Sequence, residues 1–163
     1  MKIAITGHSA GIGQALARIY ETHGHEIVGL SRRNGYNIRS LPKVAGMIEP
    51  CDMFINNAQV GYAQTELLFE VWRRWRGQQK YIVNIGTQMT DMLLPPKEEW
   101  DEYIIQKKAL DLSTQLLEQR SEWPQLLLVR PGSIATQPGQ EPPLYQNVDD
   151  YACGVYEWIQ KNI

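Results

Sequence analysis

Short apolar segments alternate with longer amphipathic segments along this chain of 163 residues. The short segments are rich in β-branched side chains and are bounded by glycine, asparagine or proline, which is typical of buried parallel strands. They predict strands at residues 2–6, 26–31, 52–56, 81–86 and 126–130, and a short extended piece at 36–38 brings the count to about six.

The longer segments place apolar residues three and four positions apart, which predicts amphipathic helices. These helices lie at residues 14–23, 41–48, 64–75, 100–120 and 148–163, and a loop containing Pro95 and Pro96 precedes the fourth of them. Strands that alternate with helices are typical of an α/β fold with a doubly wound parallel sheet. No internal repeat divides the chain, so we expect a single domain over residues 1–163.

The turn between the first strand and the first helix is rich in glycine and reads Thr6-Gly7-His8-Ser9-Ala10-Gly11-Ile12-Gly13. Glycine permits a tight turn, a close approach of backbone to a pyrophosphate, and close packing of helix on strand. The first N–H groups of the helix have no partners within it and therefore form an anion site. A structural glycine turn is the alternative, but the position between strand and helix favours a Rossmann-like dinucleotide-binding unit.

The second predicted strand ends in Ser31-Arg32-Arg33, without an acidic residue. In dinucleotide-binding folds an acidic side chain at this position binds the adenosine ribose, whereas arginine accommodates a 2′-phosphate. Guanidinium groups also bind phosphate in a forked geometry. The sequence therefore favours NADP(H) over NAD(H), with a solvated basic loop as the alternative.

Composition excludes several classes of function. Lys and Arg total 16 against 18 Asp and Glu, for a net charge of −2, so no broad basic field points to nucleic acid. No apolar segment is long enough to span a membrane, and the first residues lack the pattern of a signal peptide. Cys51 and Cys153 lack metal-ligand spacing, so we expect reduced thiols, no metal site and a cytoplasmic location.

Tyr103 and Lys107 lie four residues apart in the predicted fourth helix, and hence on one face of it. The pair alone is weak, because two surface side chains give the same spacing. Thr87, however, follows a predicted strand and so lies at the carboxyl edge of the sheet, where ligands bind in such folds.

Five motifs now stand in one order along the chain. They are Thr6-Gly7-x3-Gly11-x-Gly13, Asn56-Asn57-Ala58, Val83-Asn84-Ile85-Gly86-Thr87, Tyr103-x3-Lys107 and Arg130-Pro131-Gly132-x3-Thr136. Their order and spacing resemble those of the short-chain dehydrogenase/reductase family. The resemblance implies an NAD(P)-dependent oxidoreductase that interconverts a small carbonyl compound and its alcohol by hydride transfer.

The resemblance also implies the roles of single residues. Tyr103 would be the general acid–base, Lys107 would lower the pKa of Tyr103 and hold the nicotinamide ribose, and the Thr87 hydroxyl would polarise the carbonyl. The predicted cofactor-binding residues are Gly7, His8, Ser9, Gly11, Ile12, Gly13, Ser31, Arg32, Arg33, Asn37, Asn57, Ala58, Ile85, Tyr103, Lys107, Pro131, Gly132, Ile134 and Thr136.

Three features depart from the family pattern. Gln59 stands where a glycine is expected, the helix at 64–75 has no asparagine to serve as the fourth catalytic residue, and only one helix follows the last strand, which predicts an open substrate site. These departures leave two alternatives: a catalytically weak or inactive dinucleotide-binding regulator or redox sensor, and a fold kept for a structural role without a ligand.

Oligomers of this family pair through helices that correspond here to residues 64–75 and 100–120. The resemblance thus implies a homodimer or homotetramer, with a small-molecule substrate as the other partner. Trp72 and Trp75 lie on the apolar stripe of the first of these helices. We interpret them as core residues, with a position at a subunit contact as the alternative.

Overall fold

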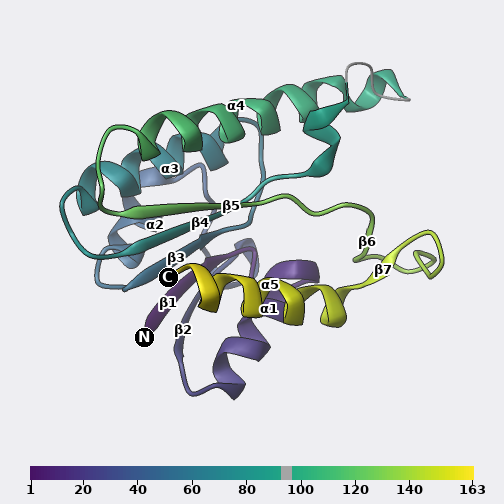
Figure 1. The fold of residues 1–163 in the computed structure, drawn as a ribbon, viewed down its shortest axis with the longest axis horizontal. Helices are drawn as coiled ribbons and strands as arrows, with labels where there is room; N and C mark the ends of the chain where they lie inside the picture. The colour runs from purple at the N-terminus through teal and green to yellow at the C-terminus, as the bar shows by residue number, and fades with distance from the viewer. Residues whose placement is uncertain (93–96) are drawn as a thin grey trace.

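The fold of this chain is built on a five-stranded parallel sheet, seen in a computed structural model that describes residues 1–92 and 97–163. The predicted loop with Pro95 and Pro96 lies outside the described residues. The strand order is β2-β1-β3-β4-β5, with β1 (Lys2–Thr6), β2 (Glu26–Leu30), β3 (Met53–Asn56), β4 (Tyr81–Ile85) and β5 (Gln125–Val129). The predicted doubly wound α/β fold is confirmed (Figure 1).

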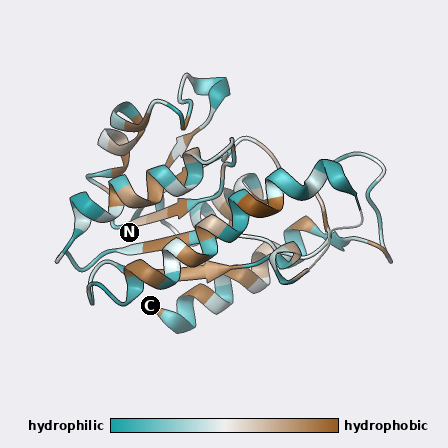
Figure 2. Ribbon diagram, turned by 90° about the horizontal axis from the view of Figure 1, so that it is seen from above, coloured by the Kyte–Doolittle hydropathy of each residue, from teal (hydrophilic) through white to brown (hydrophobic). Residues whose placement is uncertain are grey.

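Helices cover both faces of the sheet (Figure 1). One face carries α1 (Gly11–Thr22) and α5 (Val148–Asn162), and the other carries α2 (Leu41–Ile48), α3 (Ala63–Trp75) and α4 (Asp101–Glu118). Alternate strand residues point to opposite faces, so Ile3 and Ile5 pack in the first layer and Ala4 in the second. Figure 2 shows hydrophobic residues along the strands, and hydrophobic and hydrophilic residues together on the helices that enclose them.

The main sheet has five strands rather than about six, because residues 36–38 do not pair with it. The backbone N–H of Arg39 donates to the Asn37 side chain at 3.0 Å, and the N–H of Ser40 donates to the Asn37 carbonyl at 2.9 Å. This local turn satisfies polar groups that a strand would direct to a neighbour. A minor parallel pair, β6 (Ile134–Ala135) with β7 (Gln146–Asn147), closes the loop before α5 instead.

Trp72 and Trp75 belong to the core of the domain. Trp75 is fully buried and Trp72 is 8% exposed, and both pack between α3 and the sheet. The Trp75 indole N–H also donates to the Glu49 carbonyl at 3.2 Å. The interpretation as core residues is therefore correct, and the alternative of an exposed contact at a subunit boundary is wrong.

The strand order reverses direction between β1 and β3. The connection that follows β1 and the connection that follows β3 therefore leave the carboxyl ends of these strands toward opposite sides. Such a reversal opens a crevice in which doubly wound sheets bind ligands. Among the helices described, none is long and apolar enough to cross a bilayer.

Candidate active site

The loops after β1 and β3 are locked together at the carboxyl edge of the sheet. The Thr6 hydroxyl oxygen accepts hydrogen bonds from the backbone N–H groups of Asn57 at 3.0 Å and Ala58 at 3.1 Å. The Asn57 side-chain amide donates in return to the Thr6 carbonyl at 3.0 Å. The buried Thr6 thus fixes the glycine turn against the Asn56-Asn57-Ala58 segment, and these two segments form the floor of the crevice.

The glycine turn has no room for side chains at two of its three glycines. Gly7 has φ +71° and Gly11 has φ +54°, a left-handed conformation that favours glycine. A Cβ atom at Gly13 would lie 2.5 Å from the Gly7 carbonyl oxygen, and one at Gly7 would lie 2.8 Å from the Asn57 amide nitrogen. Helix α1 starts here with no side-chain cap and no acidic residue in its first turn, so its N–H groups are free to bind an anion.

Two cavities flank this turn. The first, of about 330 Å³, lies over the end of β2 and is lined in part by Gly7, Ser9, Ser31, Arg32, Arg33 and Ala58. Arg33 Nη1 donates to the Ser9 carbonyl at 3.4 Å, which holds one guanidinium across the mouth of the turn. The cavity therefore joins the predicted anion site to the predicted 2′-phosphate arginines.

The second cavity, of about 230 Å³, gathers the predicted catalytic residues from β4 and α4. Thr87, Tyr103 and Lys107 line it together with the predicted cofactor-binding residues Ile12, Asn57, Ile85, Pro131, Gly132, Ile134 and Thr136. Residues from the whole length of the chain thus meet in one place, because the loops after β1, β3, β4 and β5 all end at the same edge (Figure 1).

Lys107 is buried, and its ammonium group has two fixed partners. Nζ donates to the Gln64 side-chain oxygen and to the Ile85 carbonyl, each at 2.8 Å. Burial lowers the pKa of Lys107 to about 8, while the Asp111 carboxylate acts in the opposite direction. The ammonium lies 5.8 Å from the centroid of the Tyr103 ring, so a positive charge faces the phenol at pH 7.

Tyr103 and Thr87 form the polar wall of the second cavity. Tyr103 is half-buried, and this burial raises its pKa, which the neighbouring Thr87 hydroxyl partly offsets. Thr87 also caps the short helix η2 (Gln88–Asp91), since the backbone N–H of Met89 donates to its hydroxyl oxygen at 3.3 Å. The Thr87 side chain is thereby held at the edge of the cavity.

Gln64 is a site residue that the sequence pattern did not reveal. It is 2% exposed, and its side-chain amide donates to the carbonyls of Asn56 at 2.6 Å and Ile85 at 3.1 Å while its oxygen accepts from Lys107. The sequence-based prediction considers only whether this helix contains an asparagine, and so it overlooks Gln64. The available signal was its position on the apolar stripe with Leu67 and Leu68, where a polar side chain needs a buried partner.

Several predicted cofactor-binding residues do not line either cavity. His8 packs its ring against Gly29 of β2, where no side chain fits, and Asn37 lies in the turn before α2. Gly11 and Gly13 act within the glycine turn, since Gly11 lies against Thr136 and Gly13 against Gly7. Ile12 alone of that stretch of α1 reaches the second cavity.

Gln59 lies between the two cavities and lines both. Its side-chain amide donates to the Gln106 oxygen on α4, and Gln106 in turn donates to Glu102 at 3.0 Å. The departure from glycine at this position therefore places a fixed polar side chain between the adenosine side and the nicotinamide side of the crevice.

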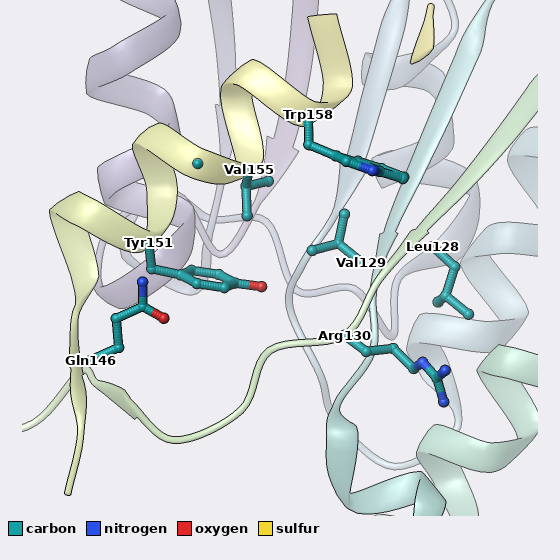
Figure 3. Close-up of a pocket in the computed structure, with 8 residues that line it drawn as sticks. Leu128, Val129, Arg130, Gln146, Tyr151, Val155 and Trp158 are labelled. Atoms are coloured by element: carbon teal, nitrogen blue, oxygen red, sulfur yellow. The ribbon is translucent and has the colours of Figure 1, made fainter. Parts of the chain in front are cut away.

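A larger cavity, of about 400 Å³, lies apart from these residues between β5 and α5 (Figure 3). Its walls are mainly apolar, with Val129 from β5 and with Tyr151, Val155 and Trp158 from α5. It contains none of the predicted site residues, so the predicted chemistry lies outside this cavity. Among the described residues, no group of three His, Cys, Asp or Glu side chains is placed to hold a metal ion.

No family model matches the chain, and no curated protein resembles it in sequence. Solved structures resemble it closely in fold at low identity. A short-chain dehydrogenase from Burkholderia cenocepacia in complex with NADP has a TM-score of 0.81 at 15% identity, over 98% of this chain and 84% of that one. A bulky-bulky ketone specific alcohol dehydrogenase from Comamonas testosteroni has a TM-score of 0.78 at 18% identity, over 98% and 82%. A 3-ketoacyl-(acyl-carrier-protein) reductase from Brucella melitensis complexed with NADH has a TM-score of 0.74 at 14% identity, over 95% and 88%.

Proposed function

We propose that this chain, which has the fold of short-chain dehydrogenases/reductases, is an NADP(H)-dependent oxidoreductase that interconverts a small carbonyl compound and its alcohol. The observation that carries the proposal is the convergence of Thr87, Tyr103 and Lys107 in one cavity beside the glycine turn. A phenol, a buried cation and a hydroxyl are the groups that proton transfer to a carbonyl oxygen requires.

The crevice fits a nicotinamide dinucleotide at three points. Gly13 leaves room for the glycine turn to pack against α1, the uncapped helix start suits a pyrophosphate, and the arginines suit a 2′-phosphate. Gly7, Ser9, Arg32, Arg33, Asn57 and Ala58 would hold the adenosine half, and Ile12, Pro131, Gly132 and Thr136 the nicotinamide half. When bound, the cofactor supplies or accepts the hydride.

The side chains of the chain itself handle the proton. Tyr103 would donate its phenolic proton to the developing alkoxide in reduction and accept it in oxidation, while Thr87 donates a hydrogen bond to the same oxygen. Lys107 would stabilise the phenolate left on Tyr103, because a nearby cation favours the charged form of a phenol. Gln64 and the Ile85 carbonyl keep the lysine in place while it does so.

Oxidation of NADPH with a panel of small aldehydes and ketones tests the proposal. We expect cofactor consumption that saturates with at least one carbonyl substrate and yields the matching alcohol. A rate no higher than that of NADPH alone across the whole panel would contradict turnover.

The Gln59–Gln106 contact favours a second candidate, a dinucleotide-binding regulator or redox sensor without turnover. This contact sets a fixed side chain between the two halves of the crevice, which would keep the nicotinamide half of a bound dinucleotide apart from Thr87, Tyr103 and Lys107. NADPH that binds in a fluorescence titration but is not consumed with any carbonyl would favour this candidate. Absence of binding at millimolar NADPH would contradict both candidates.

Replacement of both Arg32 and Arg33 with alanine is expected to weaken NADPH binding by roughly 10- to 100-fold and to leave NADH binding nearly unchanged. Both guanidiniums line the first cavity, and a charge-assisted hydrogen bond contributes roughly 1.5–3 kcal/mol. Equilibrium titration with each cofactor measures the difference. Arg39→Ala is the matched control, because Arg39 is exposed nearby but does not line the cavity. Equal losses for both cofactors would contradict a contact to the 2′-phosphate.

We also propose a homodimer that pairs through α3 and α4. Ile105, Leu112 and Leu116 are 56%, 67% and 45% exposed on α4, and their spacing places them on one side of the helix. Leu112→Lys is expected to convert the dimer to monomer in sedimentation velocity at micromolar concentration. Leu144→Lys, at a leucine 79% exposed in the loop before β7, should leave the sedimentation coefficient unchanged. A monomeric wild type would contradict the proposal.

A further inference from the structure

Helix α4 carries a third ionisable side chain in line with Tyr103 and Lys107. Asp111 lies one turn beyond Lys107 on the same side of the helix and is 7% exposed. Its Oδ2 atom accepts a hydrogen bond from the Thr90 hydroxyl at 2.8 Å. Its Oδ1 atom is buried without a hydrogen-bond partner among the described residues and lies against Gly86, where a Cβ atom would approach it to 2.8 Å.

Asp111 joins the three segments that carry the rest of the candidate site. Thr90 belongs to η2, the short helix that Thr87 caps. Arg130 follows β5 and directly precedes Pro131 and Gly132, and its Nη1 atom lies 4.0 Å from Asp111 Oδ2. Arg130 also borders the large cavity between β5 and α5, where its side chain is drawn in Figure 3.

The charges around Asp111 come from each of these segments. Lys107 faces it from α4, Arg130 faces it from the end of β5, and Asp91 of η2 lies beyond Arg130, with its Oδ1 atom 2.5 Å from Arg130 Nη1. Burial raises the pKa of Asp111, and Thr90, Arg130 and Lys107 each act to lower it. An ionised Asp111 compensates the buried ammonium of Lys107, which Gln64 and Ile85 solvate without any negative charge.

We infer that Asp111 is a positioning residue that holds the Thr87 segment and the Arg130-Pro131 segment against α4 and places a negative charge one helical turn from the ammonium group of Lys107. The first effect acts through Thr90 and Arg130, and the second acts through charge. Asp111 lines neither of the two cavities of the crevice, so it acts on the reaction only through these neighbours. The inference rests on the proposed function for its effect on rate, but its effects on Lys107 and η2 belong to the ligand-free protein.

Asp111→Asn tests the inference, since asparagine keeps the size of the side chain and an acceptor for Thr90 but removes the charge. If the protein turns over, we expect kcat to fall about 10-fold and the alkaline limit of carbonyl reduction to move down by about one pH unit, with NADPH affinity changed less than about threefold. The direction follows from Lys107, which loses its proton at lower pH without the carboxylate. Asp91→Asn is the matched control, because it removes a negative charge from the same arginine without touching Lys107 and should leave the pH profile in place.

Two readouts on the ligand-free protein separate failure of this inference from failure of the proposed function. NMR titration of the Lys107 side chain should show a lower pKa in Asp111→Asn than in wild type, and the backbone amides of residues 88–91 should exchange about 10-fold faster. If Asp111→Asn does not fold, Thr90→Val serves instead, with faster exchange at 88–91 and an unchanged Lys107 titration. Unchanged Lys107 titration in folded Asp111→Asn, or unchanged exchange at 88–91 in the tested variant, would overturn the inference.

Discussion

Replacing Tyr103 with phenylalanine is expected to lower kcat for carbonyl reduction by roughly 10²- to 10⁴-fold, the usual contribution of a positioned general acid. The substitution removes one oxygen and keeps the ring that lines the second cavity. NADPH affinity should therefore change little. Steady-state oxidation of NADPH together with a binding titration separates the two effects, since a loss in kcat at constant affinity indicates an interaction made during reaction.

Tyr151→Phe is the matched control for this experiment. Tyr151 is also half-buried, and burial raises its pKa to about 12, but it lies in the large cavity between β5 and α5 (Figure 3). Loss of its hydroxyl should leave turnover within about twofold of wild type, as expected for a residue outside the reacting groups. Equal turnover in Tyr103→Phe and wild type would contradict the role of Tyr103 as general acid–base.

The environment of Tyr103 explains why the phenol needs its lysine. Burial raises the pKa of Tyr103, which disfavours the phenolate that must form when the proton leaves. The Lys107 ammonium group lies 5.8 Å from the ring centroid, and two hydrogen bonds fix its position. The cation that faces the phenol therefore lacks the conformational freedom of a lysine on the surface. Lys107 is charged at pH 7 but by a narrow margin, because burial lowers its pKa to about 8, and its own surroundings therefore matter to the chemistry.

Local patterns were sufficient to predict most of the scaffold. The apolar run of Ile3, Ala4 and Ile5 lies within five consecutive residues, and a continuous apolar run predicts a strand buried on both faces, as observed. The spacing from Tyr103 to Lys107 is likewise local, because one turn of helix sets their common face. Parallel strands then bring their carboxyl ends to one edge, which places Thr87 near the pair without further information.

Contacts between distant residues limited what could be predicted. Gln64 contacts Lys107, which lies 43 positions away in the sequence, and Gln59 contacts Gln106, which lies 47 positions away. Neither contact can be recognised from a short stretch of sequence. Asp111 has the same difficulty, because its partners Thr90 and Arg130 belong to other segments. The segment at 36–38 failed for the opposite reason: its extended sequence resembled a strand, but the Asn37 side chain and carbonyl close a turn there.

Gly13→Ala is expected to destabilise the fold by roughly 2 kcal/mol and to lower the melting temperature by roughly 4–8 °C. Alanine normally stabilises a helix interior relative to glycine by about 1 kcal/mol, so propensity alone predicts the opposite sign. At Gly13 the added methyl would lie 2.5 Å from the Gly7 carbonyl oxygen and 2.6 Å from the Asn57 amide nitrogen. Gly7 is held by its N–H to the Leu30 carbonyl at 2.8 Å, and Asn57 is held by Thr6.

Gly154→Ala is the control that separates the steric clash at Gly13 from the higher helix propensity of alanine. Gly154 lies inside α5, and a Cβ atom there would meet nothing within 4 Å, so the same substitution should stabilise the protein by about 0.5–1 kcal/mol. Opposite signs for two identical substitutions in two helices, measured by urea unfolding, would locate the cost of Gly13→Ala in the glycine turn. Gly13→Ala should also lose NADPH binding, because relief of its clash requires the glycine turn to move off the start of α1. A Gly13→Ala protein as stable as Gly154→Ala would mean that the turn accommodates a side chain, and the close packing of strand, turn and helix would not be what shapes this site.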